Sequence, residues 1–533
     1  MKQIKNIILF MMGILLMVSC NKKIAELRTD PNNPTSVPPS LILGTVLVDM
    51  AGQGSAGNLG GLGSWSNVHS WNQYFCQNYD YYGNNIYSWT NGSFDPYLVL
   101  KNVVQMESEA TTRGAATINP YESVGKFIRA YYYYNLTSLF GDVPQAQALQ
   151  AGANSNPAYS SQKQVFQYIL NVLDTANSHL TTLIANNDNS LSASQDLFYQ
   201  GNLVQWQKLV NSFKIRVLIS LSAKASDPDL NVAVQFANII NNHSKYPVFT
   251  GQSDDMAYNY NATYAPYPFT PTNFGSIAGR FNMAYTYVNA LTTINDPRVF
   301  ITCDPAWALA GSDPNPAQYK YFAGASTGEP LSTMYGNAGA GKYSFISRKR
   351  YYANFTGEPD VLVGYKELCF NIAEGISRGW ASGNAEAYYK KGIAESMKFY
   401  GIDTAQTNFT AYFLPPGVSN SLLVVPYPFT FNFSSYYAQP AVKYSSVNAV
   451  NQIVLQKYIA CFQNSGYEGY YNWRRTGVPA FQGGSGVGNN GIVPVRWAYP
   501  VSEQSQNKAN YTAALTAQGF TADDLNQKMW LIK

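Results

Sequence analysis

The apolar residues of this chain recur with the spacing of an α-helix in two separated stretches. In the first, apolar side chains fall at i, i+3, i+4 and i+7 over residues 124–131, and the pattern recurs over 165–180 and 206–221. In the second it covers 361–400 and returns at about 447–464. This period places the apolar side chains on one face of each helix. The pattern therefore predicts a mostly α-helical fold.

The helices also pair along the chain. Val361 to Gly379 predicts one helix and Ala385 to Phe399 a second, with a Ser-Gly-Asn turn at 382–384 between them. Small residues stand at positions where the two helices would pack. Such units resemble tetratricopeptide repeats, and a generic helical bundle is the alternative. Further candidate pairs join 119–140 with 161–185 and 198–223 with 229–243.

The segment between the helical stretches, about 244–360, is rich in proline, glycine and tyrosine. Proline interrupts helices, so helices of ordinary length do not fit there. Disordered segments contain few aromatic residues. We therefore expect long ordered loops with short helices and strands, and a second loop-rich portion over about 401–446.

The N-terminus has the layout of a secretory signal. Lys2 and Lys5 precede an unbroken apolar run from Ile7 to Val18, and Cys20 follows Ser19. The run is shorter than the roughly 20 residues that span a bilayer. We interpret 1–19 as a bacterial lipoprotein signal peptide, Cys20 as the lipidated residue and 20–40 as a proline-containing tether. The alternative is an ordinary secreted protein.

Charge and cysteine content exclude several classes of protein. Only 12% of the 533 residues are charged and the net charge is +4, so a clustered basic face for nucleic acid is not expected. Besides Cys20, the cysteines are scattered and three disulfide pairings remain open. Two of them, Cys369 and Cys461, lie in helical patterns and are expected to be buried thiols.

Catalytic motifs are missing from the sequence. The three histidines, His69, His179 and His243, lack zinc-ligand spacing, and no nucleophile elbow or phosphate-binding loop occurs. We expect no enzymatic activity and no cofactor, with Ca²⁺ as the alternative because oxygen donors are plentiful. Asp142, which precedes Val143-Pro144, is interpreted as a turn or cap residue.

Aromatic side chains interleaved with asparagines suggest a surface for a neutral ligand rich in hydroxyl groups. Aromatic faces stack on C–H surfaces, and planar amides bind hydroxyls at the edge. These aromatic residues fall in three segments, 65–89, 258–267 and 335–352. For any single ring a core position is favoured, whereas for the clusters together we expect at least one to form a ligand platform. The candidate ligand-binding residues are Trp65, Trp71, Tyr81, Tyr82, Asn84, Trp89, Tyr260, Tyr264 and Tyr267.

Six segments in order resemble the SusD/RagB family of outer-membrane nutrient-binding lipoproteins. The more specific are Phe-Gly-Asp-Val-Pro at 140–144 and Arg-Arg-Thr-Gly at 474–477. We expect Arg474 and Arg475 to hold carbonyls and carboxylates rather than ligand. The full set is 139–144, 211–216, 296–298, 373–379, 456–460 with 472–477, and 499–507.

This resemblance implies a single SusD-like domain over 41–533. Its tetratricopeptide-like scaffold would cover about 41–243 and 361–464, with a C-terminal region at 465–533. It also implies a non-catalytic lipoprotein that is lipid-anchored in the outer membrane and faces the cell surface. Such proteins capture oligosaccharides and deliver them to a SusC-like TonB-dependent transporter. Capture of peptides by the same architecture is the second possibility, and a structural tetratricopeptide adaptor is the third.

Overall fold

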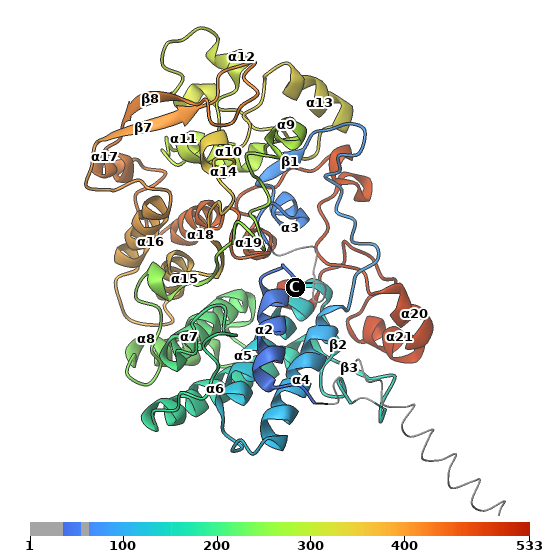
Figure 1. The fold of residues 1–533 in the computed structure, drawn as a ribbon. Helices are drawn as coiled ribbons and strands as arrows, with labels where there is room; N and C mark the ends of the chain where they lie inside the picture. The colour runs from blue at the N-terminus through green and yellow to red at the C-terminus, as the bar shows by residue number, and fades with distance from the viewer. Residues whose placement is uncertain (1–35, 55–62, 151) are drawn as a thin grey trace, which may run out of the picture.

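The computed structural model describes residues 36–54, 63–150 and 152–533 (Figure 1). The predicted signal peptide, Cys20 and most of the tether lie outside these residues. Helix is the dominant structure, as predicted. The sheets described are four two-stranded pairs: β1 (Phe75–Gln77) with β5 (Phe281–Met283), β2 (Val143–Pro144) with β3 (Tyr159–Ser160), β4 (Met256–Tyr258) with β6 (Asp360–Val363), and β7 (Asn408–Phe413) with β8 (Val425–Thr430). Within the described ranges, none of the helices is both long and apolar enough to cross a bilayer.

A layer of antiparallel helices forms the lower half of the molecule in Figure 1. Consecutive helices pack on each other, α4 on α5, α5 on α6, α6 on α7 and α7 on α8, while α2 packs on α4. Side-chain caps fix where several of them begin, as at Ser161, whose hydroxyl and Gln164 form a capping box. The helices are α2 (Pro39–Met50), α4 (Pro96–Thr112), α5 (Pro120–Phe140), α6 (Gln162–Ala185), α7 (Leu203–Ser220) and α8 (Val232–Asn241).

The second helical stretch forms α15 (Tyr365–Ser377), α16 (Ala385–Phe399), α18 (Ala449–Ala460) and α19 (Glu468–Thr476). Glycines let these helices approach closely. A Cβ at Gly375 would collide with the ring of Phe236 in α8, and one at Gly392 would collide with Phe370. The α15–α16 pair and its small packing residues therefore match the tetratricopeptide-like prediction, except that the first helix begins at Tyr365 and not at Val361, because Asp360–Val363 pairs with β4 as strand β6.

Short elements fill the segment between the two helical stretches. Helices there are brief, with α10 (Tyr285–Thr292) and α13 (Leu331–Gly339) among the longer ones, which confirms the loop-rich prediction. The other elements of this segment are β4 (Met256–Tyr258), α9 (Phe274–Ile277), η3 (Ala278–Arg280), β5 (Phe281–Met283), α11 (Val299–Thr302), α12 (Trp307–Ala310), α14 (Arg348–Tyr351) and β6 (Asp360–Val363).

The second loop-rich portion forms a hairpin of β7 (Asn408–Phe413) and β8 (Val425–Thr430), followed by α17 (Phe433–Ala438). In the antiparallel register, Pro426 lies opposite Tyr412 and Pro428 opposite Thr410. Proline has no N–H to donate and is tolerated in a strand where the backbone faces away from the partner. Helices α11 and α14 pack against β7.

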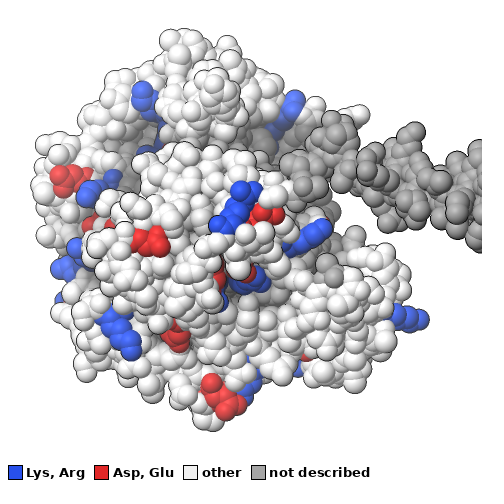
Figure 2. Space-filling model, turned by 60° about the horizontal axis from the view of Figure 1, so that its bottom comes forward, with Lys and Arg blue, Asp and Glu red and all other residues white. Residues whose placement is uncertain are grey.

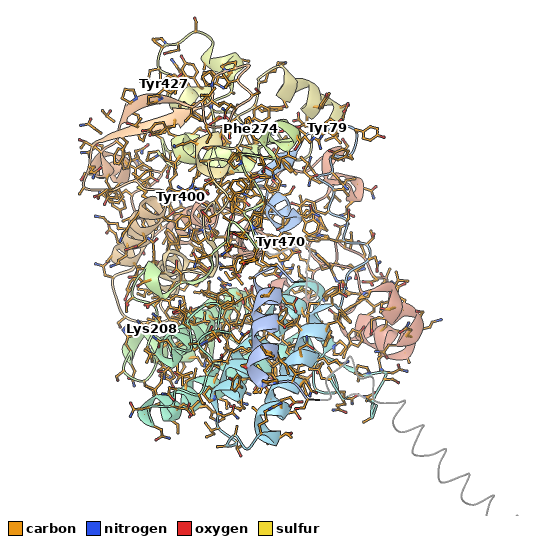
Figure 3. All side chains as sticks on the ribbon, in the orientation of Figure 1. Tyr79, Lys208, Phe274, Tyr400, Tyr427 and Tyr470 are labelled. Carbon is orange, nitrogen blue, oxygen red and sulfur yellow. The ribbon has the colours of Figure 1, made fainter. Side chains whose placement is uncertain are left out.

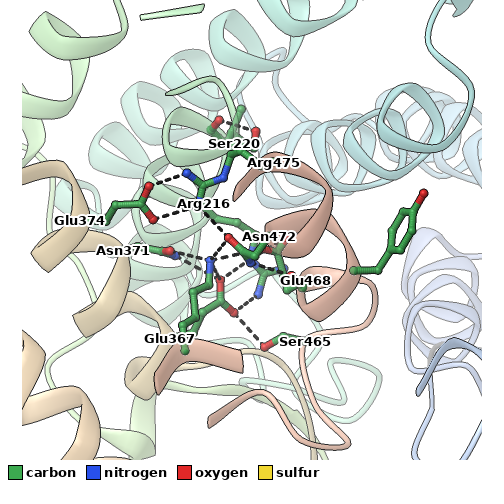
Figure 4. A network of polar contacts seen from close by, with 12 residues as sticks. Arg216, Ser220, Glu367, Asn371, Glu374, Ser465, Glu468, Asn472 and Arg475 are labelled. Carbon is green, nitrogen blue, oxygen red and sulfur yellow. Dashed lines mark hydrogen bonds and ion pairs between the residues drawn. The ribbon is translucent and has the colours of Figure 1, made fainter. Parts of the chain in front are cut away.

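A buried network of charges joins the two helical halves (Figure 4). The Arg216 Nε in α7 donates to a carboxylate oxygen of Glu367 in α15 at 2.8 Å. In the same network Arg475 in α19 donates to both carboxylate oxygens of Glu374, with one Nη2–Oε2 distance of 2.9 Å. Burial alone would raise the pKa of Glu374, but Arg475 and Arg378 overcome it and lower the pKa to about 2.

The two family-motif arginines are therefore structural, as predicted. Arg475 binds the Glu374 carboxylate, and Arg474 donates to the carbonyl oxygens of Ser138 at 2.7 Å and Val495 at 2.9 Å. Asp142 is a cap residue, because its Oδ1 accepts the Gln162 N–H at the start of α6. The four cysteines of the described residues are free buried thiols, as expected for Cys369 and Cys461.

The C-terminal region returns to the first helical layer. After α20 (Val501–Gln506) and α21 (Lys508–Ala517), the chain ends in the short helix η7 (Trp530–Ile532). The Leu531 N–H donates to the Gln162 side chain at 2.8 Å, and the Trp530 ring lies 6.4 Å from Phe166. These contacts hold the end of the chain against α6.

Candidate functional site

Exposed tyrosines gather on the loop that follows β1 (Phe75–Gln77), at the edge of the upper half of the molecule where Figure 3 labels Tyr79. The ring centroids of Tyr79 and Tyr82 lie 4.8 Å apart, those of Tyr81 and Tyr82 6.0 Å, and those of Tyr79 and Tyr335 6.0 Å. The Arg280 guanidinium lies 4.8 Å from the Tyr79 centroid and 5.1 Å from that of Tyr82. We call these five residues the tyrosine cluster.

Strand pairing brings the two parts of the cluster together. The β1–β5 register places Gln77 opposite Phe281, so the chain leaving β1 passes the residue that enters β5. The Asn78 N–H donates to the Arg280 carbonyl at 2.9 Å. The buried Asn85 side chain accepts the Gln77 N–H at 2.9 Å and donates to the Gln77 carbonyl at 2.8 Å, which closes the loop at its base.

The turn itself depends on Gly83. Its N–H donates to the Tyr79 carbonyl at 2.6 Å, and a Cβ at this position would collide with that same oxygen. A residue with a side chain would open the turn and separate the rings. The loop therefore holds the tyrosines in a fixed arrangement before any ligand arrives.

The cluster presents flat, uncharged faces to solvent. Tyr81 is 84% exposed, Tyr82 57% and Tyr335 43%. A guanidinium over an aromatic ring is attracted by the electrons of its face, so Arg280 steadies the tyrosines on one side. The remaining faces can stack on C–H groups while the phenol hydroxyls bind polar edges. On the face shown in Figure 2, charged side chains are scattered among uncharged ones.

Five of the predicted ligand-binding rings are core residues, which corrects that part of the prediction. Trp65 and Trp71 are each 8% exposed, Trp89 is fully buried, and Tyr260 and Tyr267 are 6% and 1% exposed. They cannot stack on a ligand in this structure, because their faces already contact other parts of the protein. The loop-rich portion needs apolar filling, and large rings supply it.

The contacts of these rings show why they are buried. The Trp65 ring lies 4.8 Å from both Phe269 and Tyr351, and its N–H donates to the Tyr267 hydroxyl at 2.6 Å. Trp71 meets Trp89 edge to face at 5.4 Å. Trp65 belongs to the core of the upper half, while Trp71 and Trp89 both contact Trp497 of the C-terminal region.

The other predicted residues are exposed. Tyr81 and Tyr82 belong to the cluster. Asn84 lies beside it and uses its Oδ1 to accept the Ile86 N–H at 2.7 Å. Tyr264 is 89% exposed, on a turn closed by the Asn261–Ala265 bridge, and makes no ring contact with the cluster among the described residues. Ligand binding by these four residues stays a prediction.

Arg280 is the member of the cluster that the sequence did not indicate. Tyr79 and Tyr335 stand in the aromatic segments, but Arg280 precedes a three-residue strand whose partner is about 200 positions earlier in the chain. Only the register of β1 on β5 places it under the tyrosines.

Comparison with known proteins identifies the family to which this chain belongs. Residues 31–500 match the sequence profile of a family described as SusD-like, starch-binding and associating with the outer membrane. This chain belongs to the SusD-like family. The resemblance inferred from the six sequence segments is thereby confirmed. No curated protein matches the chain significantly.

Solved structures agree with the SusD-like assignment. Two SusD homologues from Bacteroides fragilis share 26% and 29% identity with this chain, cover 93% of it and 100% of their own length, and give TM-scores of 0.77 and 0.74. A chitin-binding SusD homologue from Flavobacterium johnsoniae is 18% identical to this chain. The match covers 93% of this chain and 98% of the homologue's length, with a TM-score of 0.67. At that identity the last comparison shows the fold alone.

In the described part of this SusD-like chain, no group of three or more His, Cys, Asp or Glu side chains is arranged to hold a metal ion. Whether the protein needs no cofactor or binds Ca²⁺ stays a prediction. The exposed aromatic cluster has a chemistry suited to an uncharged ligand rich in hydroxyl groups.

Proposed function

We propose that this protein captures oligosaccharides at the outer membrane without cleaving them and delivers them to a SusC-like TonB-dependent transporter. The observation that carries the proposal is the tyrosine cluster, in which exposed rings are held in place over Arg280. A sugar presents a C–H face and hydroxyl edges without charge, and exposed tyrosines complement both. The family description, starch-binding and associating with the outer membrane, supports the same ligand class.

Binding to purified full-length protein tests the proposal. We would measure affinity for malto-oligosaccharides and chito-oligosaccharides by calorimetry, with Tyr82→Ala and Arg280→Ala as variants. Loss of a stacking ring is expected to lower affinity about 5- to 150-fold. The matched control is Tyr412→Ala, because Tyr412 is also exposed and also carries a cation, Lys349, 5.5 Å from its ring centroid.

Two results would contradict the proposal. One is equal affinity in wild type, Tyr82→Ala and Arg280→Ala, which would place any glycan elsewhere. The other is release of shorter sugars during long incubation, with activity that persists through repurification, which would indicate an enzyme.

Peptide capture is the second candidate, and one observation favours it. The Arg280 guanidinium contacts tyrosine rings and forms no ion pair within the described residues, so it is available to bind a peptide carboxylate. Peptides therefore form a second arm of the binding panel. Binding of peptides but of no oligosaccharide would replace the glycan proposal with the peptide one.

Delivery requires a partner, since the described residues contain no helix able to span a membrane. We would extract the protein in mild detergent with a C-terminal tag and identify what accompanies it by mass spectrometry. One dominant TonB-dependent barrel is the expected result. Recovery of this protein alone, under conditions that preserve other outer-membrane complexes, would contradict delivery to such a transporter and favour a different role.

A further inference from the structure

A pocket adjoins the short helical segment that ends in Arg280. It has a volume of about 310 Å³ and is bounded by α9 and η3, by α12, by Arg348 of α14 and by the loop 414–419. Figure 3 labels Phe274 of α9 at this place. A volume near 300 Å³ is at the lower end of the range for small-molecule sites. We call it the Trp307 pocket.

Trp307 is the residue that sets this pocket apart. The other eight tryptophans each contact another aromatic ring, but Trp307 makes no ring contact and no side-chain hydrogen bond among the described residues. It is half-buried and lines the pocket. Trp307 packs partly against the hydrophobic core of the upper half, and its remaining surface forms part of the pocket wall, where an indole can stack on a sugar ring and donate its N–H to the edge of that ring.

The wall formed by α9 and η3 is kept open by two glycines. Gly275 and Gly279 are four residues apart, which places them on one face of a helical segment. A Cβ at either position would meet nothing within 4 Å, and neither residue has a positive φ. Neither backbone strain nor close packing in this structure explains glycine here. Their effect is to leave room in the pocket and expose the backbone to whatever fills it.

The polar groups of the pocket form a nearly neutral pair. Asp304 is 3% exposed, lines the pocket, and its Oδ1 has no hydrogen-bond partner among the described residues. The Arg348 Nε lies 3.7 Å from the other carboxyl oxygen, and its Nη1 donates to the Ala278 carbonyl at 2.8 Å. Because an acid and a base lie together at this wall, an uncharged ligand with polar edges suits the pocket better than an ion.

We propose that the Trp307 pocket is a second glycan subsite that holds one sugar ring beside the tyrosine cluster. This inference rests on the proposed function. The two sites share one segment, because Gly279 lines the pocket while the next residue, Arg280, lies over Tyr79 and Tyr82. From Gly275 to Arg280 the segment rises only about 8–10 Å, so a single oligosaccharide can reach both sites.

The test is the dependence of affinity on oligosaccharide length. Wild-type protein would be titrated with malto- and chito-oligosaccharides of two to six units. In Trp307→Ala, and in Gly275→Leu, which fills the pocket, we expect the longer oligomers to lose about tenfold or more in affinity while the shortest lose little. The control is Gly251→Leu, because an added Cβ at Gly251 would meet only the Ser253 hydroxyl, at 3.9 Å, and Gly251 lies outside both the pocket and the tyrosine cluster.

A fluorescence measurement covers the case in which Trp307→Ala does not fold. The ligand-induced change in tryptophan emission should shrink in Trp307→Phe, which keeps a ring in the pocket. Melting curves check the folding of every variant.

The outcomes separate this inference from the proposed function. If Trp307→Ala and Gly275→Leu bind every length like wild type while Tyr82→Ala loses binding, the pocket is not a subsite and the proposed function stands. If wild-type protein binds no oligosaccharide, both are overturned. If affinity falls equally at all lengths in the pocket variants, the pocket is not an extension of the cluster and the two-site arrangement is wrong.

Discussion

Glu374 is fully buried and has two arginines as its counter-ions, Arg475 and Arg378. Replacing it by glutamine leaves their charges without a partner in a region of low dielectric constant. We expect Glu374→Gln to lower the free energy of unfolding by about 3–5 kcal/mol in urea titrations. Lys163→Met is the control, because Lys163 binds Asp227 and Asp229 at the surface and such pairs contribute at most about 1 kcal/mol. Equal losses in the two variants would contradict the buried network as a source of stability.

The pKa of Asp142 is shifted in the opposite direction to that of Glu374. Burial raises the pKa of Asp142 to about 6, although the Gln162 N–H opposes the shift. The native protein therefore keeps a proton that the unfolded chain loses near pH 4, and stability falls as pH rises from about 4 to 6. Asp142→Asn retains an acceptor for Gln162 and removes the titration. We expect the wild type to lose of the order of 2–3 kcal/mol relative to Asp142→Asn across this window, measured by unfolding at several pH values. A constant difference between the two proteins would show that Asp142 does not titrate there.

Among the elements, helix packing depends on glycines whose roles the structure distinguishes. Gly375 in α15 faces the Phe236 ring without room for a Cβ, whereas Gly336 in α13 faces open space. Gly375→Ala should push α15 from α8 and lower the melting temperature, at a cost of about 1–3 kcal/mol. Gly336→Ala should raise stability by about 0.4–1 kcal/mol, because alanine restricts the unfolded chain. Calorimetry of both variants checks the prediction, and a stabilised Gly375→Ala would show that the helices are not in contact there.

Elements were more predictable from the sequence than the site. Periodic apolar residues determine helices such as α6 and α15 locally, because each helical turn depends only on residues three or four positions apart. The exposure of a ring depends on what lies above it, which the chain can supply from any distance. Trp65 is covered by Phe269 and Tyr351, some 200 or more positions later, while Tyr81 is not covered. Composition therefore identified aromatic segments but could not separate core rings from exposed ones.

At the scale of the whole molecule, the predicted attachment to a membrane depends on Cys20, which lies outside the described residues. The basic start and the apolar run before it predict lipidation of its thiol. Cys20→Ala should move the protein from the membrane fraction to the soluble fraction, because several acyl chains, at about 0.8 kcal/mol per buried CH₂, would be lost. Immunoblots of separated fractions measure this. Unchanged membrane retention would contradict lipidation, and Cys76→Ala is a control that removes a buried thiol far from the signal.

The hairpin of β7 and β8 affects whether many copies of the protein can lie close together without aggregating. The free edge of a two-stranded sheet invites the same edge of another molecule to pair with it, and chains of such contacts become fibres. Pro426 and Pro428 alternate along β8, so that side of the ladder lacks two successive donors, and α11 and α14 pack against β7. A strand from another molecule would meet carbonyl acceptors along this edge, but no N–H donors at Pro426 and Pro428. The protein can therefore be crowded without polymerising through this hairpin.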